Sequence, residues 1–200
     1  MRVPAISYLI FFVVSGNSMA NNCDCITDAS IKSKPDTTII TDSLKNPSGY
    51  YYLSDLPLRQ VATLLLNDSL HPSDNNITFN CMDSIATDNI ETRNFYFPVF
   101  LKILDKADGA LAEVVGMYVV NYIEKYPKEF AIRSMALTDK EFISFAYSAG
   151  VELYFDKDNI NNSRKWTDAV LKNCAGCDAQ QIRQIQRFNS TVVQAVIENN

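Results

Sequence analysis

The segment from Ala110 to Tyr126 constrains the fold more than any other part of the chain. In a helix its polar residues would cover only about one third of the circumference, and apolar residues the rest. A stripe that wide cannot be buried against a single neighbour, so the segment predicts a central helix flanked on two sides. Pro127 ends this helix, because proline lacks the backbone N–H that would continue it. The polar positions are Glu113, Asn121, Glu124 and Lys125.

Apolar residues recur at helical spacing through most of the chain after Tyr50. We therefore predict an all-α fold, a compact bundle of about six or seven helices with short connections. A HEAT-like helical array is the alternative, although no fixed-period repeat is present. The other expected helices cover Ser54 or Asp55 to Leu65 with Pro57 in the first turn, then Phe79–Ala86, Asn94–Lys106, Thr138–Phe155, Ser163–Leu171, and Asp178 to near the C-terminus. Only a short turn of helix is expected near Lys128 to Ser134.

Two of these helices begin with recognisable capping residues. Thr138 and Glu141 form a capping box, in which the hydroxyl and the carboxylate each bond a free backbone N–H. Asp178, with Gln181 three residues later, caps the last helix in the same way. Gly150 lies on the inner face of the helix that starts at Thr138. Because a glycine there weakens the helix by about 1 kcal/mol, its presence predicts a close crossing with another helix.

The first twenty residues have the layout of a secretory signal peptide. Arg2 supplies the positive charge, Ala5 to Val14 is an apolar run, and the segment ends in a small-x-small pattern at Ala20. The run would rise about 15 Å as a helix, half of the ~30 Å hydrocarbon core, so cleavage near Asn21 is expected rather than a membrane anchor. Residues 21–49 then form a polar, largely irregular leader, and residues 50–200 form the helical domain.

These features predict a periplasmic or secreted protein. We favour a bacterial periplasmic protein, and a glycosylated eukaryotic secreted protein is the alternative. The chain has N-x-S/T sequons at Asn67, Asn76, Asn161 and Asn189. Asn189 falls within the expected apolar stripe of the last helix, where a glycan would conflict with packing.

The charge of the chain limits its partners. The formal net charge is −5 and the isoelectric point about 4.9. No local cluster of lysine and arginine offsets this balance, which argues against a nucleic-acid partner. After signal cleavage no transmembrane span is expected either.

The five cysteines are Cys23, Cys25, Cys81, Cys174 and Cys177, and an oxidising compartment makes disulfides the default. Cys174–Cys177 is the first choice of bridge, because a turn between helices can bring the two Cα atoms close enough. A link from Cys23 or Cys25 to Cys81 would tie the leader to the domain. A thioredoxin-type redox motif at Cys174-x-x-Cys177 and a zinc site of Cys23, Cys25, Cys174 and Cys177 are the competing interpretations.

No catalytic motif is recognisable in the chain. His71 is the only histidine and has no nearby motif partner. Glu113 and Glu124 would lie about 16 Å apart along one helix, too far for a glycosidase-type pair. The sequence therefore favours a non-enzymatic protein and predicts no catalytic residue, metal or cofactor. The alternatives are an envelope-associated structural domain and an enzyme with dispersed carboxylates.

Tyr50, Tyr51 and Tyr52 are the one patch with recognition chemistry, because tyrosine gives large contact area at low entropic cost. They are a possible interface, and covering the entrance to the core is the alternative role. In its signal peptide, size and helix content the chain resembles the periplasmic immunity proteins that neutralise secreted toxins. This resemblance implies an exported protein-binding module or inhibitor with a protein partner. It assigns no functional role to any particular residue of this chain.

Overall fold

A computed structural model describes residues 56–154 and 159–198 of the chain. Across these residues the secondary structure is entirely helical, which confirms the all-α prediction. The predicted signal peptide and leader lie outside this range, as do Tyr50, Tyr51 and Tyr52. The helices are α1 (Leu58–Leu66), α2 (Asn76–Asp83), the 3-10 helix η2 (Ser84–Ala86), α3 (Ile90–Lys106), α4 (Gly109–Lys125), α5 (Pro127–Ser134), α6 (Asp139–Tyr154), α7 (Asn159–Asn173) and α8 (Ala179–Glu198).

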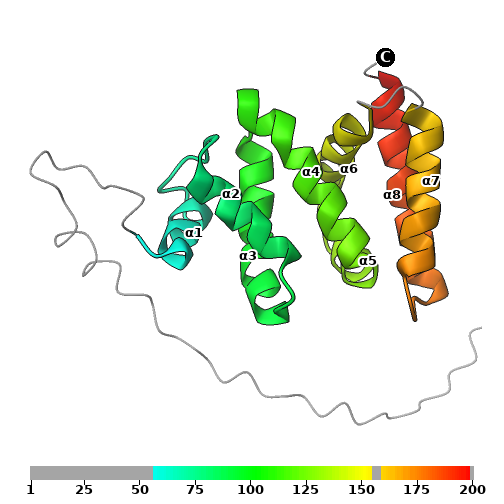
Figure 1. Ribbon diagram of the computed structural model, residues 1–200, viewed down its shortest axis with the longest axis horizontal. Coiled ribbons are helices and arrows are strands. Elements are labelled where there is room, and N and C mark those ends of the chain that lie inside the picture. Colours follow the sequence, from blue (N-terminus) through cyan, green and yellow to red (C-terminus); the bar gives the residue numbers. More distant parts are fainter. Residues whose placement is uncertain (1–55, 155–158, 199–200) are drawn as a thin grey trace, which may run out of the picture. The chain divides into compact units, whose positions relative to one another are not determined.

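The described helices follow one another from α1 at one end to α7 and α8 at the other (Figure 1). The most extensive contacts join α4 with α6 and α6 with α8, helices that are not consecutive in the chain. One apolar core runs through all of these helices. The described range holds eight α-helices, because the short turn expected near Lys128 is a full helix, α5.

Helix α4 occupies the central position that its wide apolar surface predicts. It contacts α2, η2, α5, α6 and α7, and Val115, Val119 and Ile123 are fully or almost fully buried. Along residues 56–154 and 159–198, no helix combines the length and the apolar character needed to cross a lipid bilayer.

The close helix crossing of the described core lies at Gly116. A β-carbon at this position would overlap the carbonyl oxygen of Ser148 on α6 and would lie 3.0 Å from Cβ of Glu152. Gly150, where the sequence predicted a close crossing, is buried on α6, and a close approach at that position stays a prediction. The glycine that allows α4 and α6 to approach is thus on the central helix.

Gly116→Ala is expected to destabilise the protein by about 1–3 kcal/mol, even though alanine is the better helix former. The added methyl meets backbone atoms of α6, so the two helices must move apart. Urea denaturation measures the effect, and Met117→Ala, at the exposed neighbouring position, is the control. A Gly116→Ala variant as stable as the parent would show that the crossing is loose.

Both predicted caps are confirmed. Thr138 donates its backbone N–H to Oε2 of Glu141 at 2.8 Å, and Glu141 donates its own to the Thr138 hydroxyl at 3.3 Å. Oδ1 of Asp178 accepts the backbone N–H groups of Gln180 and Gln181, both at 2.8 Å. Gln181 closes the second box by accepting the Asp178 N–H at 3.0 Å.

Four predicted helix starts were wrong. Helix α2 begins at Asn76 and not at Phe79, because Oδ1 of Asn75 accepts the backbone N–H of Thr78 at 2.9 Å and caps the helix. Pro57 is the N-cap of α1 and not part of its first turn. Helix α3 begins at Ile90, because Oδ1 of Asn89 accepts the backbone N–H of Thr92 at 2.8 Å and so provides a cap upstream of Asn94. Helix α7 begins at Asn159, and Ser163, predicted as its cap, is fully buried within it.

Candidate docking groove

An open groove of about 600 Å³ lies between the start of α3, helix α5 and the joint of α7 and α8. Ile90 and Ile132 line it and are 57% and 52% exposed, which is unusual for isoleucine. Tyr126 and Pro127 add further apolar surface between them. We call this feature the α5 groove. Its lining combines apolar side chains with the polar groups described next.

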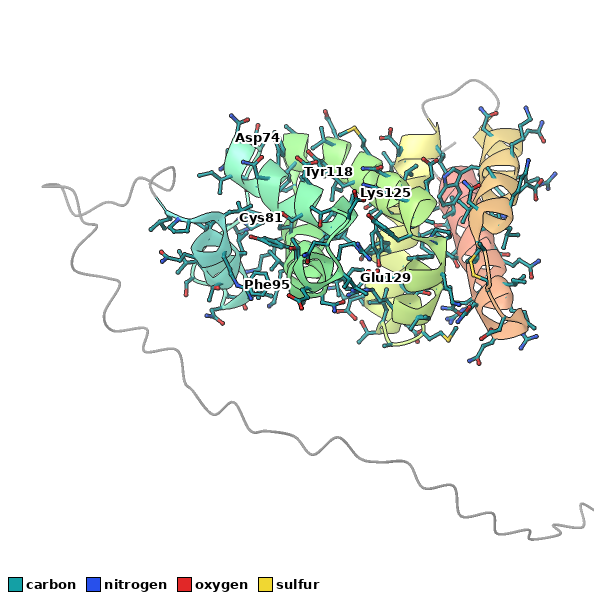
Figure 2. The ribbon with its side chains drawn as sticks, turned by 60° about the horizontal axis from the view of Figure 1, so that its bottom comes forward. Asp74, Cys81, Phe95, Tyr118, Lys125 and Glu129 are labelled. Carbon is teal, nitrogen blue, oxygen red and sulfur yellow. A yellow bond between two sulfur atoms is a disulfide. The ribbon has the colours of Figure 1, made fainter. Side chains whose placement is uncertain are left out.

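The floor of the α5 groove is a cluster of charges around Glu129. Oε2 of Glu129 accepts hydrogen bonds from Nε and Nη2 of Arg93 at 3.0 and 2.7 Å. Its other oxygen, Oε1, pairs with Arg133 Nη2 at 2.9 Å and accepts the Tyr122 hydroxyl at 3.2 Å. Glu129, on α5, thereby connects this helix to α3 and α4. Figure 2 labels Glu129 together with Lys125, the last residue of α4.

The cluster is partly shielded from solvent, and its charges compensate one another. Burial raises the pKa of the Glu129 carboxyl, but the hydrogen bond from Arg93 and the charges of Arg133 and Arg93 outweigh it, so the pKa lies below its usual value. The guanidinium of Arg93 stacks 3.8 Å from the ring centre of Tyr126 and donates to the carbonyl of Thr87 at 2.8 Å. These contacts fix the floor and leave Glu129 ionised at neutral pH.

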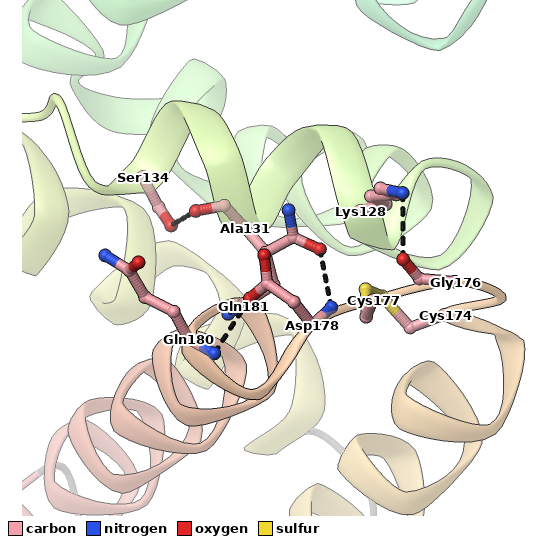
Figure 3. The surroundings of a disulfide bond; sticks show 9 residues. All are labelled: Lys128, Ala131, Ser134, Cys174, Gly176, Cys177, Asp178, Gln180 and Gln181. Atoms are coloured by element: carbon pink, nitrogen blue, oxygen red, sulfur yellow. Dashed lines mark hydrogen bonds between the residues drawn. A yellow bond between two sulfur atoms is a disulfide. The ribbon is translucent and has the colours of Figure 1, made fainter. Parts of the chain in front are cut away.

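One wall of the groove is the loop between α7 and α8, which the Cys174–Cys177 disulfide closes. The two Cα atoms lie 5.5 Å apart, so the predicted bridge is confirmed. Figure 3 shows the Lys128 ammonium of α5 donating to the carbonyl of Gly176 in this loop, at 2.8 Å. Gly176 has φ +73°, a conformation that favours glycine over other residues. The disulfide therefore shapes the surface that Lys128 contacts.

Removing this bridge, as Cys174→Ser with Cys177→Ser, is expected to lower the free energy of unfolding by about 2 kcal/mol, the chain-entropy value for so short a loop. Urea denaturation of the parent and of the doubly substituted variant, both without reductant, measures the loss. Free thiols at both positions together with one equivalent of bound zinc would contradict the assignment and favour the metal interpretation.

Cys81, labelled in Figure 2, lies on α2, is fully buried and has no disulfide partner among the described residues. Burial raises its pKa to about 11. A link to Cys23 or Cys25 would require the leader to reach this core position. Because those two cysteines lie outside the described residues, the link stays a prediction.

The other residues considered from the sequence do not gather in the groove. His71 lies in the loop before α2, and its Nδ1 is 2.8 Å from the carbonyl oxygen of Pro72. Glu124 accepts the indole N–H of Trp166 at 2.8 Å, which gives it a structural role between α4 and α7. Glu113 is exposed. Oδ1 of Asn189 is buried and has no hydrogen-bond partner among the described residues, in agreement with the expectation that a glycan there would conflict with packing.

A second hollow, of about 390 Å³, lies between α3 and α6, and three of the four charged side chains that line it are in ion pairs. Lys140 binds Asp105 there. Lys102 and Lys106 both bind the neighbouring Asp68, and their hydrogen bonds, that of Lys106 foremost, lower its pKa to about 2. This hollow therefore offers fewer exposed apolar side chains than the α5 groove.

Reasoning from the sequence missed the residues of the α5 groove. Arg93 and Glu129 are far apart in the chain, and nothing in their local sequence indicates that they pair. Ile90 is the first residue of α3, and Ile132 lies in the short helix α5. The buried face of a helix is hard to assign by periodicity at its first residue or in so short a segment. The one available signal was the short α5 itself, which holds Ile132 between charged residues.

Comparison with known proteins gives no relative: no family model, curated protein or solved structure matches the chain. The groove must therefore be interpreted from its own chemistry.

Proposed function

We propose that this chain is an exported, non-enzymatic protein-binding module of the periplasmic immunity or inhibitor type, and that the α5 groove is its docking surface. The observation that carries the proposal is the exposure of Ile90 and Ile132 in one open groove. Protein interfaces combine apolar and polar side chains, and so does the lining of the groove. The fixed charge cluster beneath it gives a preorganised surface, which lowers the cost of binding.

The chemistry of the groove favours binding over catalysis. Glu129 is its only carboxylate, and both carboxylate oxygens are occupied by guanidinium groups. A general acid or base at neutral pH needs a pKa near 7, whereas the pKa of Glu129 is lowered. The groove lining also includes no serine, cysteine or histidine that could act as a nucleophile with a base.

A pull-down from the native organism with the mature protein as bait tests the proposal. One discrete protein should bind the parent chain and the Ile143→Asp variant, and should be lost from the Ile132→Asp variant. Ile143 is the matched control because it is 56% exposed, on α6, against 52% for Ile132. Equal thermal midpoints of the two variants exclude misfolding. A partner retained equally by both variants would place docking elsewhere.

The export part of the proposal has a separate test. The chain recovered from the periplasm is expected to begin at or near Asn21, because the signal-peptide layout ends at Ala20. Intact-mass spectrometry measures this directly. A mass that still includes residues 1–20 would refute cleavage and favour a membrane anchor.

A further inference from the structure

The α5 groove is positively charged in an otherwise acidic chain. Lys125, Lys128 and Arg133 line it against the single carboxylate of Glu129, a formal charge of +2, whereas the whole chain carries −5. Charge of one sign in a concave surface attracts partners of the opposite sign. Among the protein partners that the proposed function allows, the positive charge of the groove therefore favours acidic ones.

The three cations differ in how far they are already neutralised. Arg133 is paired with Glu129 at 2.9 Å, and Lys125 lies 3.1 Å from Asp88. Lys128 has no carboxylate partner among the described residues, and its ammonium group donates a hydrogen bond to the neutral carbonyl of Gly176. An ammonium group has three N–H donors, so Lys128 keeps two for another acceptor.

Lys128 and the exposed Ile132 lie one helical turn apart on α5. Side chains at this spacing share a face of the helix, with β-carbons about 6 Å apart. A ligand can therefore meet the ammonium group and the isoleucine at once if it carries an acidic and an apolar side chain at a similar spacing. Neighbours one turn apart on a helix, or two residues apart on an extended strand, have that spacing.

We infer that the α5 groove binds an acidic segment of a partner protein, an inference that rests on the proposed function. An apolar side chain of this segment lies between Ile90 and Ile132, and one of its carboxylates pairs with the Lys128 ammonium group. The carboxylate replaces water at Lys128, which has no carboxylate partner in the described part of the chain. The apolar side chain removes the two isoleucines from water, which supplies most of the affinity.

A peptide selection on the full mature chain with its disulfide intact tests this inference. Random displayed peptides are selected on the parent protein, and those lost on Ile132→Asp but kept on Ile143→Asp are defined as groove-dependent. We expect these peptides to be acidic, with an aliphatic or aromatic residue beside the acidic ones.

The affinity of these peptides, measured by fluorescence anisotropy, should fall about tenfold or more in the Lys128→Glu variant. It should hardly change in Lys165→Glu, a matched control at an exposed site on α7. Peptides with lysine in place of their acidic residues should then prefer Lys128→Glu over the parent.

The outcomes separate this inference from the proposed function. Groove-dependent peptides that are neutral or basic, or that ignore Lys128→Glu, would overturn the acidic-partner inference and leave the docking groove in place. If no peptide is groove-dependent, the proposed function and this inference both fail. A parent chain that forms a dimer, which Ile132→Asp dissociates, would show that a second copy is the occupant and would also overturn the inference.

Discussion

Val115→Asp is expected to unfold the described domain or to lower its free energy of unfolding by several kcal/mol. Val115 is 1% exposed on α4, the helix with neighbours on several sides. An unpaired carboxylate in such an apolar interior costs about several kcal/mol even after relaxation, and a domain has only about 5–15 kcal/mol of stability in total. Thermal and urea denaturation, followed by circular dichroism, measure the effect.

The control for this variant is Met117→Asp, which places the same charge at a 49% exposed position of the same helix. Its free energy of unfolding should change by less than about 1 kcal/mol. An unchanged thermal midpoint for Val115→Asp would mean that the wrong face of α4 has been assigned to the core.

Glu129→Ala is expected to destabilise the protein by about 3–5 kcal/mol, the usual cost of removing one partner from a buried ion pair. The substitution leaves the Arg93 and Arg133 side chains, 7% and 18% exposed, facing each other without an anion. It also removes the acceptor of the Tyr122 hydroxyl. Glu113→Ala, at an exposed position on α4, is the control and should change the stability by less than about 0.5 kcal/mol.

The same carboxylate predicts how stability depends on pH. Because the pKa of Glu129 is lower in the folded than in the unfolded chain, its contribution is complete above the unfolded value, about 4.3. The contribution is lost as the pH falls through the lowered folded value. Urea midpoints measured between about pH 6 and pH 3 should therefore fall less steeply in Glu129→Gln than in the parent. Parallel curves for the two proteins would contradict a stabilising charge cluster.

Local signals in the sequence were sufficient for most of the fold. The wide apolar surface of α4 predicted its central place, and the Thr138–Glu141 and Asp178–Gln181 boxes predicted two helix starts, because each depends on residues close in sequence. Periodicity failed where a helix begins with polar residues. The first turns of α7 contain several asparagines, which suggested a connecting loop and moved the predicted cap to Ser163.

The docking groove could not be predicted in the same way. Its floor depends on Arg93 meeting Glu129, and tertiary packing rather than local sequence brings α3 and α5 together. The exposure of Ile90 and Ile132 likewise depends on which helices leave them uncovered. The cysteines show the same contrast between local and distant contacts. The three-residue spacing of Cys174 and Cys177 was enough to predict their bridge, whereas a disulfide partner for Cys81 would have to come from a distant part of the sequence.

Site-specific photo-crosslinking in the native organism tests most directly whether the α5 groove is the docking surface. A photoreactive phenylalanine derivative replaces Ile132 in one variant and Ile143 in a second, both exposed positions in the full chain. The account predicts one discrete crosslinked protein from position 132 and none from position 143. A crosslinked partner from position 143 alone would contradict it.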